Sequence, residues 1–331
     1  MTRAGVFKYP DGMRWNSGAI GYTLAGHAAG LLCLFSGSVW LNALGVGLVA
    51  HTVMLSAYLL HECIHETLFT GHAAHRRLAT LLCAINGGCY TGFEELRRKH
   101  LHHHSDCMDP VNIDLPPLLR DGWPRLWRLT LALEWLHVPA IELWLRLYAI
   151  ARPFTDARWR AQRGRVVAAA AARLAFFAAL LLASPRAAVL YIAGGLLGLV
   201  GLRLLDAFHH SFDLVVLPDY AAVYELPAGR DRAYEHAHTF SNLLSVRHPW
   251  LNALLLNFVY HNAHHMKPGV PWHRLPGLDG RQFGGDRRHH RTVPHILADF
   301  HRYRIARVVD SAGAQRGAVN LGAVQVSLLT P

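Results

Sequence analysis

The stretch "VWLNALGVGLVAHTVMLSAYLLHECIH", residues 39–65, joins an apolar run to a pair of histidines at its end. Residues 39–60 contain no charged side chain, and about 20 such residues are enough for a helix to cross a bilayer. His61 and His65 follow at once, and residues four apart share one face of a helix. The stretch therefore predicts a membrane helix that presents two imidazoles where it leaves the bilayer.

Three further apolar runs have a similar length, namely residues 18–38, 166–184 and 187–205. Short turns join them pairwise, so the sequence predicts an all-α integral membrane protein with four transmembrane helices in two hairpins. Residues 78–93 are too short and too rich in glycine to span, and they predict an interfacial or re-entrant segment. Residues 126–150 carry Trp, Leu and Arg at helical spacing, which predicts one amphipathic helix lying in the interface.

Basic residues indicate how these helices are oriented. Of 33 Lys and Arg residues, 14 fall within 61–165 and 13 fall after 205, and the two short turns hold only Arg186. The excess of positive charge in loops that face the cytoplasm then places both termini and the middle segment there. We expect a multi-pass protein with one membrane domain, 1–305, whose cytoplasmic helical cap comprises 61–165 and 206–305, and a C-terminal tail, 306–331.

The composition agrees with a membrane location. The chain of 331 residues is 52% hydrophobic and only 17% charged, whereas about 25% charged residues is typical of soluble proteins. The formal net charge of +11 raises nucleic-acid binding as an alternative. The arginines mostly flank apolar segments and do not alternate with exposed aromatic residues, which argues against that alternative. The five cysteines form no CxxC pair, so we interpret them as reduced thiols.

The motif HECIH has two interpretations. As H-E-x-x-H on a helix it is the zinc motif of metalloproteases, in which the glutamate is the general base. As H-x-x-x-H it is one part of a larger metal site. The rest of the chain favours the second interpretation, because an H-x-x-H-H pattern occurs twice more near the same predicted membrane face. The three sets supply eight imidazoles: His61, His65, His100, His103, His104, His261, His264 and His265.

A fourth set, "LLDAFHHSFD", lies where the last predicted span ends on that face. It offers Asp206 and His210 four residues apart, with His209 beside them. A catalytic zinc needs only three protein ligands, whereas eight to ten nitrogen and oxygen donors suit two metals, and imidazole suits iron. An intramembrane zinc protease, with Asp206 as its third ligand, remains the alternative from another class. A metal transporter would instead distribute its histidines along the spans.

In these three boxes and their order, the chain resembles the membrane fatty acid desaturases and related hydroxylases. The resemblance covers about residues 50–280 and is densest in "NLLSVRHPWLNALLLNFVYHNAHHMKPGVPWHRLPGL", residues 242–278, which resembles the third-box region of bacterial acyl desaturases. "HHHSDCMDP" is similar to the acidic-proline step that follows the second box in this family. The resemblance implies a cap that holds two non-haem iron ions, with O2 as co-substrate.

By this resemblance the eight box histidines are iron ligands, and His210 and Asp206 extend the set, although an aspartate at that position departs from the family's pattern. Glu62, Glu66, Asp213 and His209 are expected to orient the ligands from just outside, as groups behind a metal ligand do. The expected reaction is desaturation of a fatty acyl chain bound to a carrier protein, coenzyme A or a lipid. Two electrons would come from a separate ferredoxin or cytochrome. Acyl hydroxylation, acetylenic bond formation and ketolation use the same boxes, so they stay open.

Overall fold

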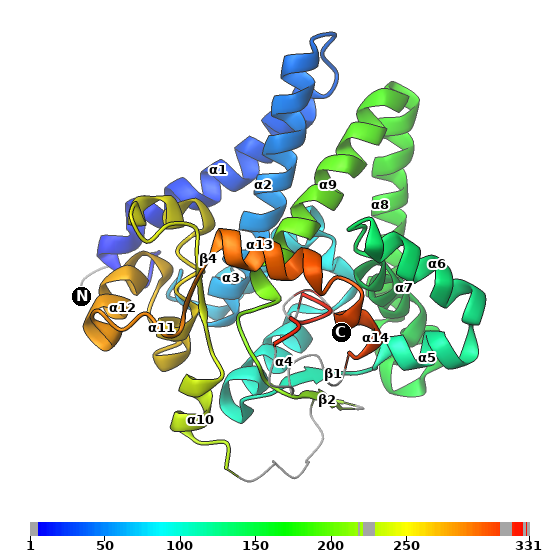
Figure 1. Ribbon diagram of the computed structural model, residues 1–331. Coiled ribbons are helices and arrows are strands. Elements are labelled where there is room, and N and C mark those ends of the chain that lie inside the picture. The colour runs from blue at the N-terminus through cyan, green and yellow to red at the C-terminus, as the bar shows by residue number, and fades with distance from the viewer. Residues whose placement is uncertain (1–5, 218, 221–228, 312–319, 327–328, 330–331) are drawn as a thin grey trace.

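The computed structural model describes residues 6–217, 219–220, 229–311, 320–326 and 329. Most of the described chain is helical (Figure 1). The first half contains η1 (Pro10–Gly12), α1 (Met13–Cys33), α2 (Val39–Ile64), α3 (His72–Asn86), η2 (Gly88–Tyr90), α4 (Phe93–Asp106), β1 (Asp109–Val111), α5 (Leu115–Gly122), α6 (Pro124–Trp135) and α7 (Ala140–Thr155). The second half contains η3 (Ala157–Gln162), α8 (Arg163–Ala183), α9 (Pro185–Asp206), β2 (Leu214–Val216), α10 (Arg232–Ala237), β3 (Ser241–Leu243), η4 (Pro249–Leu255), α11 (His261–Met266), η5 (Trp272–Arg274), α12 (Leu275–Phe283), β4 (His290–Thr292), α13 (Val293–Arg302) and α14 (Ala306–Val309).

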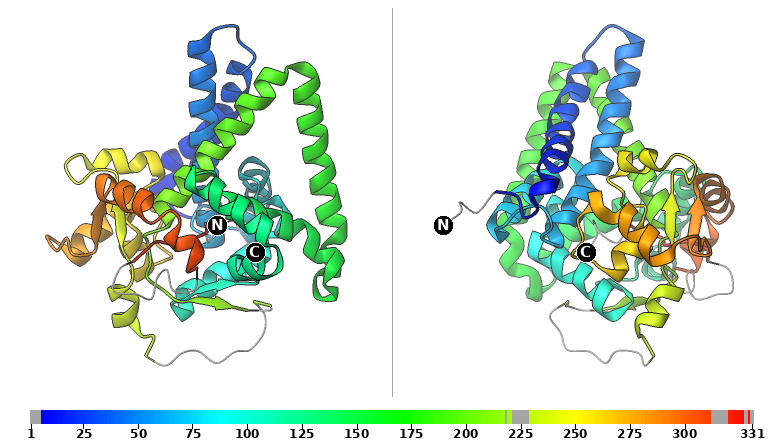
Figure 2. Two further views of the ribbon diagram at one scale, coloured as in Figure 1. Left: turned by 45° about the vertical axis from the view of Figure 1, so that its right-hand side comes forward. Right: turned by 90° about the vertical axis from the view of Figure 1, so that its left-hand side faces the viewer.

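Two long helical hairpins, α1–α2 and α8–α9, project from one side of the remaining elements (Figures 1 and 2). By length and composition, three helical segments of the described chain can cross a membrane, and they are Val39–Ile64, Ala157–Ala183 and Pro185–Asp206. Only 11% of the most apolar window of Ala157–Ala183 is buried inside the protein. That apolar surface needs a nonpolar environment, so membrane association is indicated.

The fourth expected span corresponds to α1, which is not one of these three segments. The helix covers Met13–Cys33, so it begins and ends about five residues before the predicted run 18–38. Polar residues such as Asn16, Thr23 and His27 lie within it, and they lower its mean hydropathy. The number of four spans therefore stays a prediction, as does the cytoplasmic orientation.

Close helix crossings hold the two hairpins together. A Cβ atom on Gly45 of α2 would lie 2.8 Å from the carbonyl oxygen of Gly30 in α1. On Gly198 of α9 a Cβ atom would lie 2.6 Å from the carbonyl oxygen of Ala50 in α2. Both distances are too short for any side chain, and glycine is the residue that lets membrane helices approach this closely. α2 is thereby packed closely between α1 and α9.

The sequence predicted one continuous amphipathic helix over 126–150, and this prediction is wrong. The chain forms two helices there, α6 and α7, separated at 136–139. Pro139 disfavours a helical conformation of the residue before it, and His137 adopts a left-handed φ of 61°. The interfacial segment expected at 78–93 consists of most of α3 followed by the short helix η2.

Two short parallel ladders, which the all-α prediction did not include, connect distant parts of the chain. β1 pairs with β2 in the register Asp109↔Leu214, and β3 pairs with β4 in the register Ser241↔His290. The first ladder joins the segment after α4 to the segment after α9. It therefore brings together two of the regions that carry the predicted metal ligands.

Part of the predicted C-terminal tail packs against the helices. The Arg203 side chain of α9 donates a hydrogen bond to the carbonyl oxygen of Val324 (2.8 Å) and pairs with Glu134 of α6 (2.9 Å). The backbone N–H of Val326 donates to the buried carboxylate of Glu142 in α7. These contacts fix the segment 320–326 across the end of α9, just before His209 and His210.

Candidate metal centre

The end of α2 carries the first two histidines. His61 is buried in the last turn of the helix, and His65 is its C-terminal capping residue. The next residue, Glu66, has a left-handed φ of 53°, a conformation that L-residues rarely continue as a helix. The helix therefore stops at His65 and leaves both imidazoles at its end, one turn apart.

Helix α4 supplies three more imidazoles. It begins after Gly92, carries two glutamates in its first turn and ends at Cys107, which has a left-handed φ of 50°. His100 and His104 lie one turn apart and point to one group of histidines, whereas His103 points to another. One residue's difference in spacing rotates a side chain by about 100° around a helix, so the H-x-x-H-H pattern serves two neighbouring sites.

The remaining four histidines come from α11 and from the segment after α9. α11 has six residues, and His261, His264 and His265 are all buried in it. Asn262 anchors this helix because its Nδ2 donates to the carbonyl oxygen of Thr239 (2.7 Å). His210 follows α9 and forms an antiparallel bridge with the same Thr239. Segments before and after α10 are thus tied to the third box.

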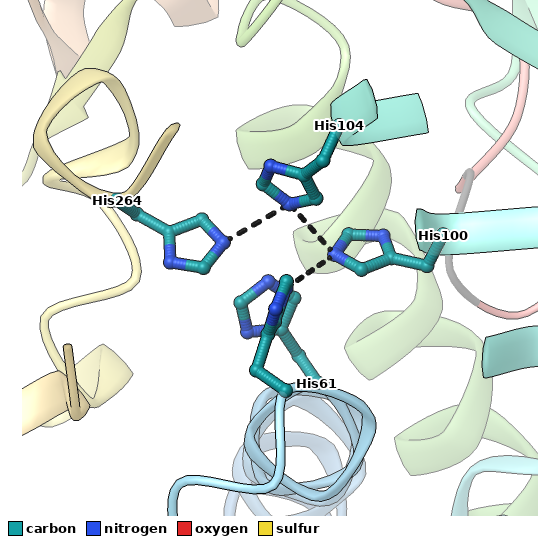
Figure 3. Close-up of side chains that lie close together, drawn as sticks. His61, His100, His104 and His264 are labelled. Atoms are coloured by element: carbon teal, nitrogen blue, oxygen red, sulfur yellow. Dashed lines mark hydrogen bonds between the residues drawn. The ribbon is translucent and has the colours of Figure 1, made fainter. Parts of the chain in front are cut away.

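The nine histidines form two groups. His61, His65, His100, His104 and His264 form the first group (Figure 3 labels four of them), and His103, His210, His261 and His265 form the second. Within each group the nitrogen atoms lie within 4.8 Å of one another. The structure therefore brings all eight box histidines and His210 together, although their role as ligands stays a prediction.

Contacts between the imidazoles fit a metal-binding role. The Nε2 atom of His210 lies 2.9 Å from Nε2 of His103 and 2.8 Å from Nε2 of His261. In the first group, Nε2 of His100 lies 2.9 Å from Nε2 of His65. A neutral imidazole carries its one proton on either Nδ1 or Nε2. If Nδ1 carries the proton and donates a hydrogen bond, Nε2 has only a lone pair. Converging lone pairs repel one another unless a cation lies between them.

Two rings of the second group have their protons fixed on Nδ1. The Nδ1 atom of His103 lies 2.9 Å from both the carbonyl oxygen of Met108 and the Oδ1 atom of Asp109. The Nδ1 atom of His265 lies 3.1 Å from Oε1 of Glu235. The Met108 carbonyl oxygen and the Glu235 carboxylate accept hydrogen bonds from these Nδ1 atoms. The lone pair on Nε2 of each ring is therefore left to bind a metal, which is how groups behind a ligand fix its tautomer. Within the described chain, Nε2 of His265 is buried without a hydrogen-bond partner.

Burial also keeps the imidazoles neutral. It lowers the pKa of His65 to about 3, and neighbouring positive groups add to this effect. Burial likewise holds the imidazole pKa well below its usual value in six other histidines, namely His100, His104, His210, His261, His264 and His265. A neutral imidazole is the form that binds a metal. The histidines are therefore ready for metal binding at neutral pH.

The other predicted residues lie around the two groups. Asp206 belongs to neither group, and its Oδ1 lies 3.6 Å from Nδ1 of His209. The ring of His209 stacks on that of His261, with centroids 4.2 Å apart. Glu66 contacts His72 (2.7 Å), and Asp213 contacts Arg230. Among the expected supporting residues, His209 thus contacts a member of the second group.

Glu62, the fourth supporting residue, has one carboxylate oxygen beside the first group, because its Oε1 lies 3.6 Å from Nδ1 of His61. Its Oε2 accepts hydrogen bonds from the Thr67 hydroxyl (2.5 Å) and from the backbone N–H of Trp272 (3.2 Å). A general base in a zinc protease must reach a water molecule on the metal. Glu62 instead fastens the end of α2 to the segment that follows the third box.

Glu235 and Asp109 are supporting residues that the sequence did not predict. Asp109 lies in the quoted stretch "HHHSDCMDP", so its position after the second box was an available signal. Glu235 is 30 residues before His265, and only the fold brings them together. Burial raises the pKa of Glu235, and the nearby Arg232 guanidinium opposes this shift.

A polar cavity of about 460 Å³ opens next to the groups. His65, His104 and His265 form part of its wall. Arg230, Arg232 and Glu235 contribute charged groups of both signs, together with Asp231. The cavity therefore borders histidines of both groups.

A protein-family model described as fatty acid desaturase matches residues 38–295 of the chain. The match includes all nine histidines of the two groups. No individual curated protein matches the sequence.

Proposed function

The chain belongs to the fatty acid desaturase family, and from this premise we propose that it is an O2-dependent membrane desaturase that introduces a double bond into a fatty acyl chain. The observation that carries this proposal is the convergence of nine histidines, seven of them buried and two half-buried, in two adjacent groups. A zinc protease needs three ligands and one metal, and it has no use for the second group.

Two non-haem iron ions are the cofactor that we propose for these groups. Histidine is a suitable ligand for iron, and iron would supply the oxidising power that removes hydrogen from an unactivated methylene, which no side chain provides. The first group would hold one ion and the second group the other. Glu235 keeps the proton of His265 on Nδ1, and the carbonyl oxygen of Met108 does the same for His103.

The overall reaction defines what else is needed. Two hydrogens leave adjacent methylenes, one O2 is reduced, and two electrons and two protons are taken up, so that two water molecules form. We propose that a separate ferredoxin or cytochrome supplies the electrons and that it carries an acidic surface, because the chain has a net charge of +11. The polar cavity beside His65 and His104 is a suitable route for protons and water.

The proposal is tested with the purified protein in lipid nanodiscs that contain saturated acyl lipids. Ferredoxin, its reductase and NADPH are added, and fatty acids are analysed by gas chromatography and mass spectrometry. We expect an unsaturated product that requires O2, and we expect His264→Ala to abolish it. His248→Ala makes the same chemical change at an exposed histidine outside both groups and should retain activity. Full activity of His264→Ala would contradict the proposal. A hydroxylated product would show that the enzyme is a hydroxylase and not a desaturase.

A further inference from the structure

A large apolar cleft lies on the membrane side of the candidate metal centre. It has a volume of about 990 Å³ and is enclosed by the first half of α1, the middle of α2, η4 and Trp272. Ligand-binding cavities commonly have about 300–1,000 Å³, so the cleft can hold a long organic molecule. Among its residues, Trp15 is 59% exposed and Leu254 is 49% exposed. Large apolar side chains left open in one place mark a surface that binds lipid or another apolar partner.

The position of the cleft along α2 relates it to the bilayer. Leu55 lines the cleft, and it lies within the segment that can cross a membrane. His61 lies six positions after Leu55, which is about 9 Å along a helix that rises about 1.5 Å per residue. The cleft is therefore open at the depth of the apolar part of α2, close to the candidate metal centre.

Two aromatic rings separate the cleft from the histidines. Tyr58 lies one turn after Leu55, and its ring stacks on Phe258 with centroids 4.5 Å apart. Phe258 follows the cleft residue Leu256 by two positions, and its ring contacts His61 (4.8 Å) and His261 (5.0 Å). These are members of the first and second histidine groups, respectively. Phe258 therefore contacts both histidine groups from a position two residues after the cleft wall.

One wall of the cleft is fastened to the same helix end. Trp272 donates its indole N–H to Asn16 of α1 (2.9 Å), and its backbone N–H donates to Glu62 (3.2 Å). The cleft and the end of α2 are therefore held in a fixed relation. This contact gives Glu62 a positioning role that its place in the HECIH motif did not suggest.

The rim of the cleft is polar and offers a cation. Arg14 lines it and is exposed, and no residue in the described part of the chain forms an ion pair with it. The nearby carboxylate of Asp11 is already paired with Arg274 (2.5 Å). An apolar cavity with a free guanidinium at its edge matches an amphiphile with a long apolar chain and an anionic head group.

We propose that this cleft admits the acyl chain of an anionic membrane lipid sideways from the bilayer and that the Tyr58–Phe258 ring pair is the barrier between the lipid and the metal centre. The proposal rests on the proposed function and names its substrate class: the chain is desaturated while its head group remains at the membrane surface near Arg14. A water-soluble thioester of coenzyme A or a carrier protein would not need an opening at the depth of the bilayer.

Two glycines of α1 provide a matched pair of variants. Gly18 lines the cleft, whereas Gly21 does not. A Cβ atom built on either glycine has no neighbour within 4 Å, so neither substitution creates a clash inside the protein. Gly18→Trp should fill the cleft, and Gly21→Trp makes the same change in bulk and hydrophobicity on the same helix.

The test uses the full-length, iron-loaded protein in phosphatidylcholine nanodiscs that contain a phosphatidylglycerol with a diazirine in one acyl chain. After irradiation, labelled peptides are mapped by mass spectrometry. We expect labelling in the segment of Leu254 and Leu256. Gly18→Trp should lower it at least roughly tenfold, the loss expected when about two methylenes no longer fit. Gly21→Trp should be labelled like the wild type. A diazirine phosphatidylcholine should label less than phosphatidylglycerol, and Arg14→Gln should remove this difference.

Iron content and product analysis separate this proposal from the proposed function. Equal labelling of the Gly18→Trp and Gly21→Trp proteins at equal iron content would overturn the proposal that the acyl chain enters through the cleft. Desaturation of only soluble thioesters, at an unchanged rate in Gly18→Trp, would also overturn it and leave the proposed function intact. Cleft labelling that responds to Gly18→Trp, in a protein that desaturates nothing, would support lipid binding and contradict the proposed function.

Discussion

Glu235 offers the sharpest test of how the second histidine group is organised. Its carboxylate is 6% exposed, and its Oε1 lies 3.1 Å from Nδ1 of His265. Glu235→Gln keeps an oxygen acceptor but removes the negative charge, whereas Glu235→Ala removes the acceptor as well. Loss of the group behind a metal ligand typically lowers metal affinity by about 10–100-fold, or about 1.4–2.8 kcal/mol at about 1.4 kcal/mol for each factor of ten.

We expect Glu235→Gln at the lower end of this range and Glu235→Ala at the upper end. Because Glu235 contacts His265 of the second group, only one of the two irons should become easier to remove. The assay follows transfer of Fe²⁺ to a coloured chelator under anaerobic conditions, at a pH where the protein is stable. The wild type should release iron slowly, and the variants should show one fast phase of about half the total amplitude.

Glu94→Gln is the control, because it makes the same chemical change at an exposed position in the first turn of α4. It should release iron like the wild type. If Glu235→Ala released iron no faster than Glu94→Gln, the hydrogen bond to His265 would have no role in metal binding. If both irons were lost equally, the division of the histidines into two separate groups would be wrong.

Three further predictions concern the stability of the detergent-solubilised protein. Gly198→Leu should destabilise the protein by about 1–3 kcal/mol, as overpacking of a tight contact does, because the new Cβ atom would lie 2.6 Å from a backbone oxygen. Gly195→Leu is the control, because Gly195 has open space on the same helix, and it should have little effect on thermal unfolding. Arg203→Ala should lower the free energy of unfolding by about 3–5 kcal/mol, the range for breaking a buried ion pair, because it leaves Glu134 buried without its cation. The double variant Arg203→Ala/Glu134→Gln should recover part of this stability in the same melting assay. In the metal-free protein, burial lowers the pKa of His65 to about 3, far below the ordinary value of 6.5 for histidine. The unfolded state therefore binds more protons between these pH values, and stability should fall as pH drops below about 6.5. A melting temperature that stays constant from pH 7.5 to 5 would refute this.

The sequence predicted the histidine site better than the architecture around it. The spacing of imidazoles at i, i+3 and i+4 depends only on local helix geometry, and the structure places nine predicted histidines within two adjacent groups. The segment after α9 was recognised by the same spacing. Asp206 was expected by this spacing too, but α9 ends at that residue, so the i, i+4 geometry does not continue to His210.

Tertiary contacts account for most of what the sequence did not predict. Glu235 reaches His265 because α10 packs beside α11, and no local pattern marks that contact. The cleft combines α1 with η4, which lie more than 200 residues apart in the chain. The break between α6 and α7 did have a local signal in Pro139, whose effect on the preceding residue competes with the helical spacing of Trp and Leu.

Metal content of the purified full-length chain tests the central claim most directly. Iron and zinc are quantified together by mass spectrometry in the wild type, in His265→Ala from the second group and in His248→Ala as a control. We expect about two irons per chain in the wild type and the control, and about one in His265→Ala. A single zinc per chain that is retained in His265→Ala would contradict the account and return the HECIH motif to the metalloprotease interpretation.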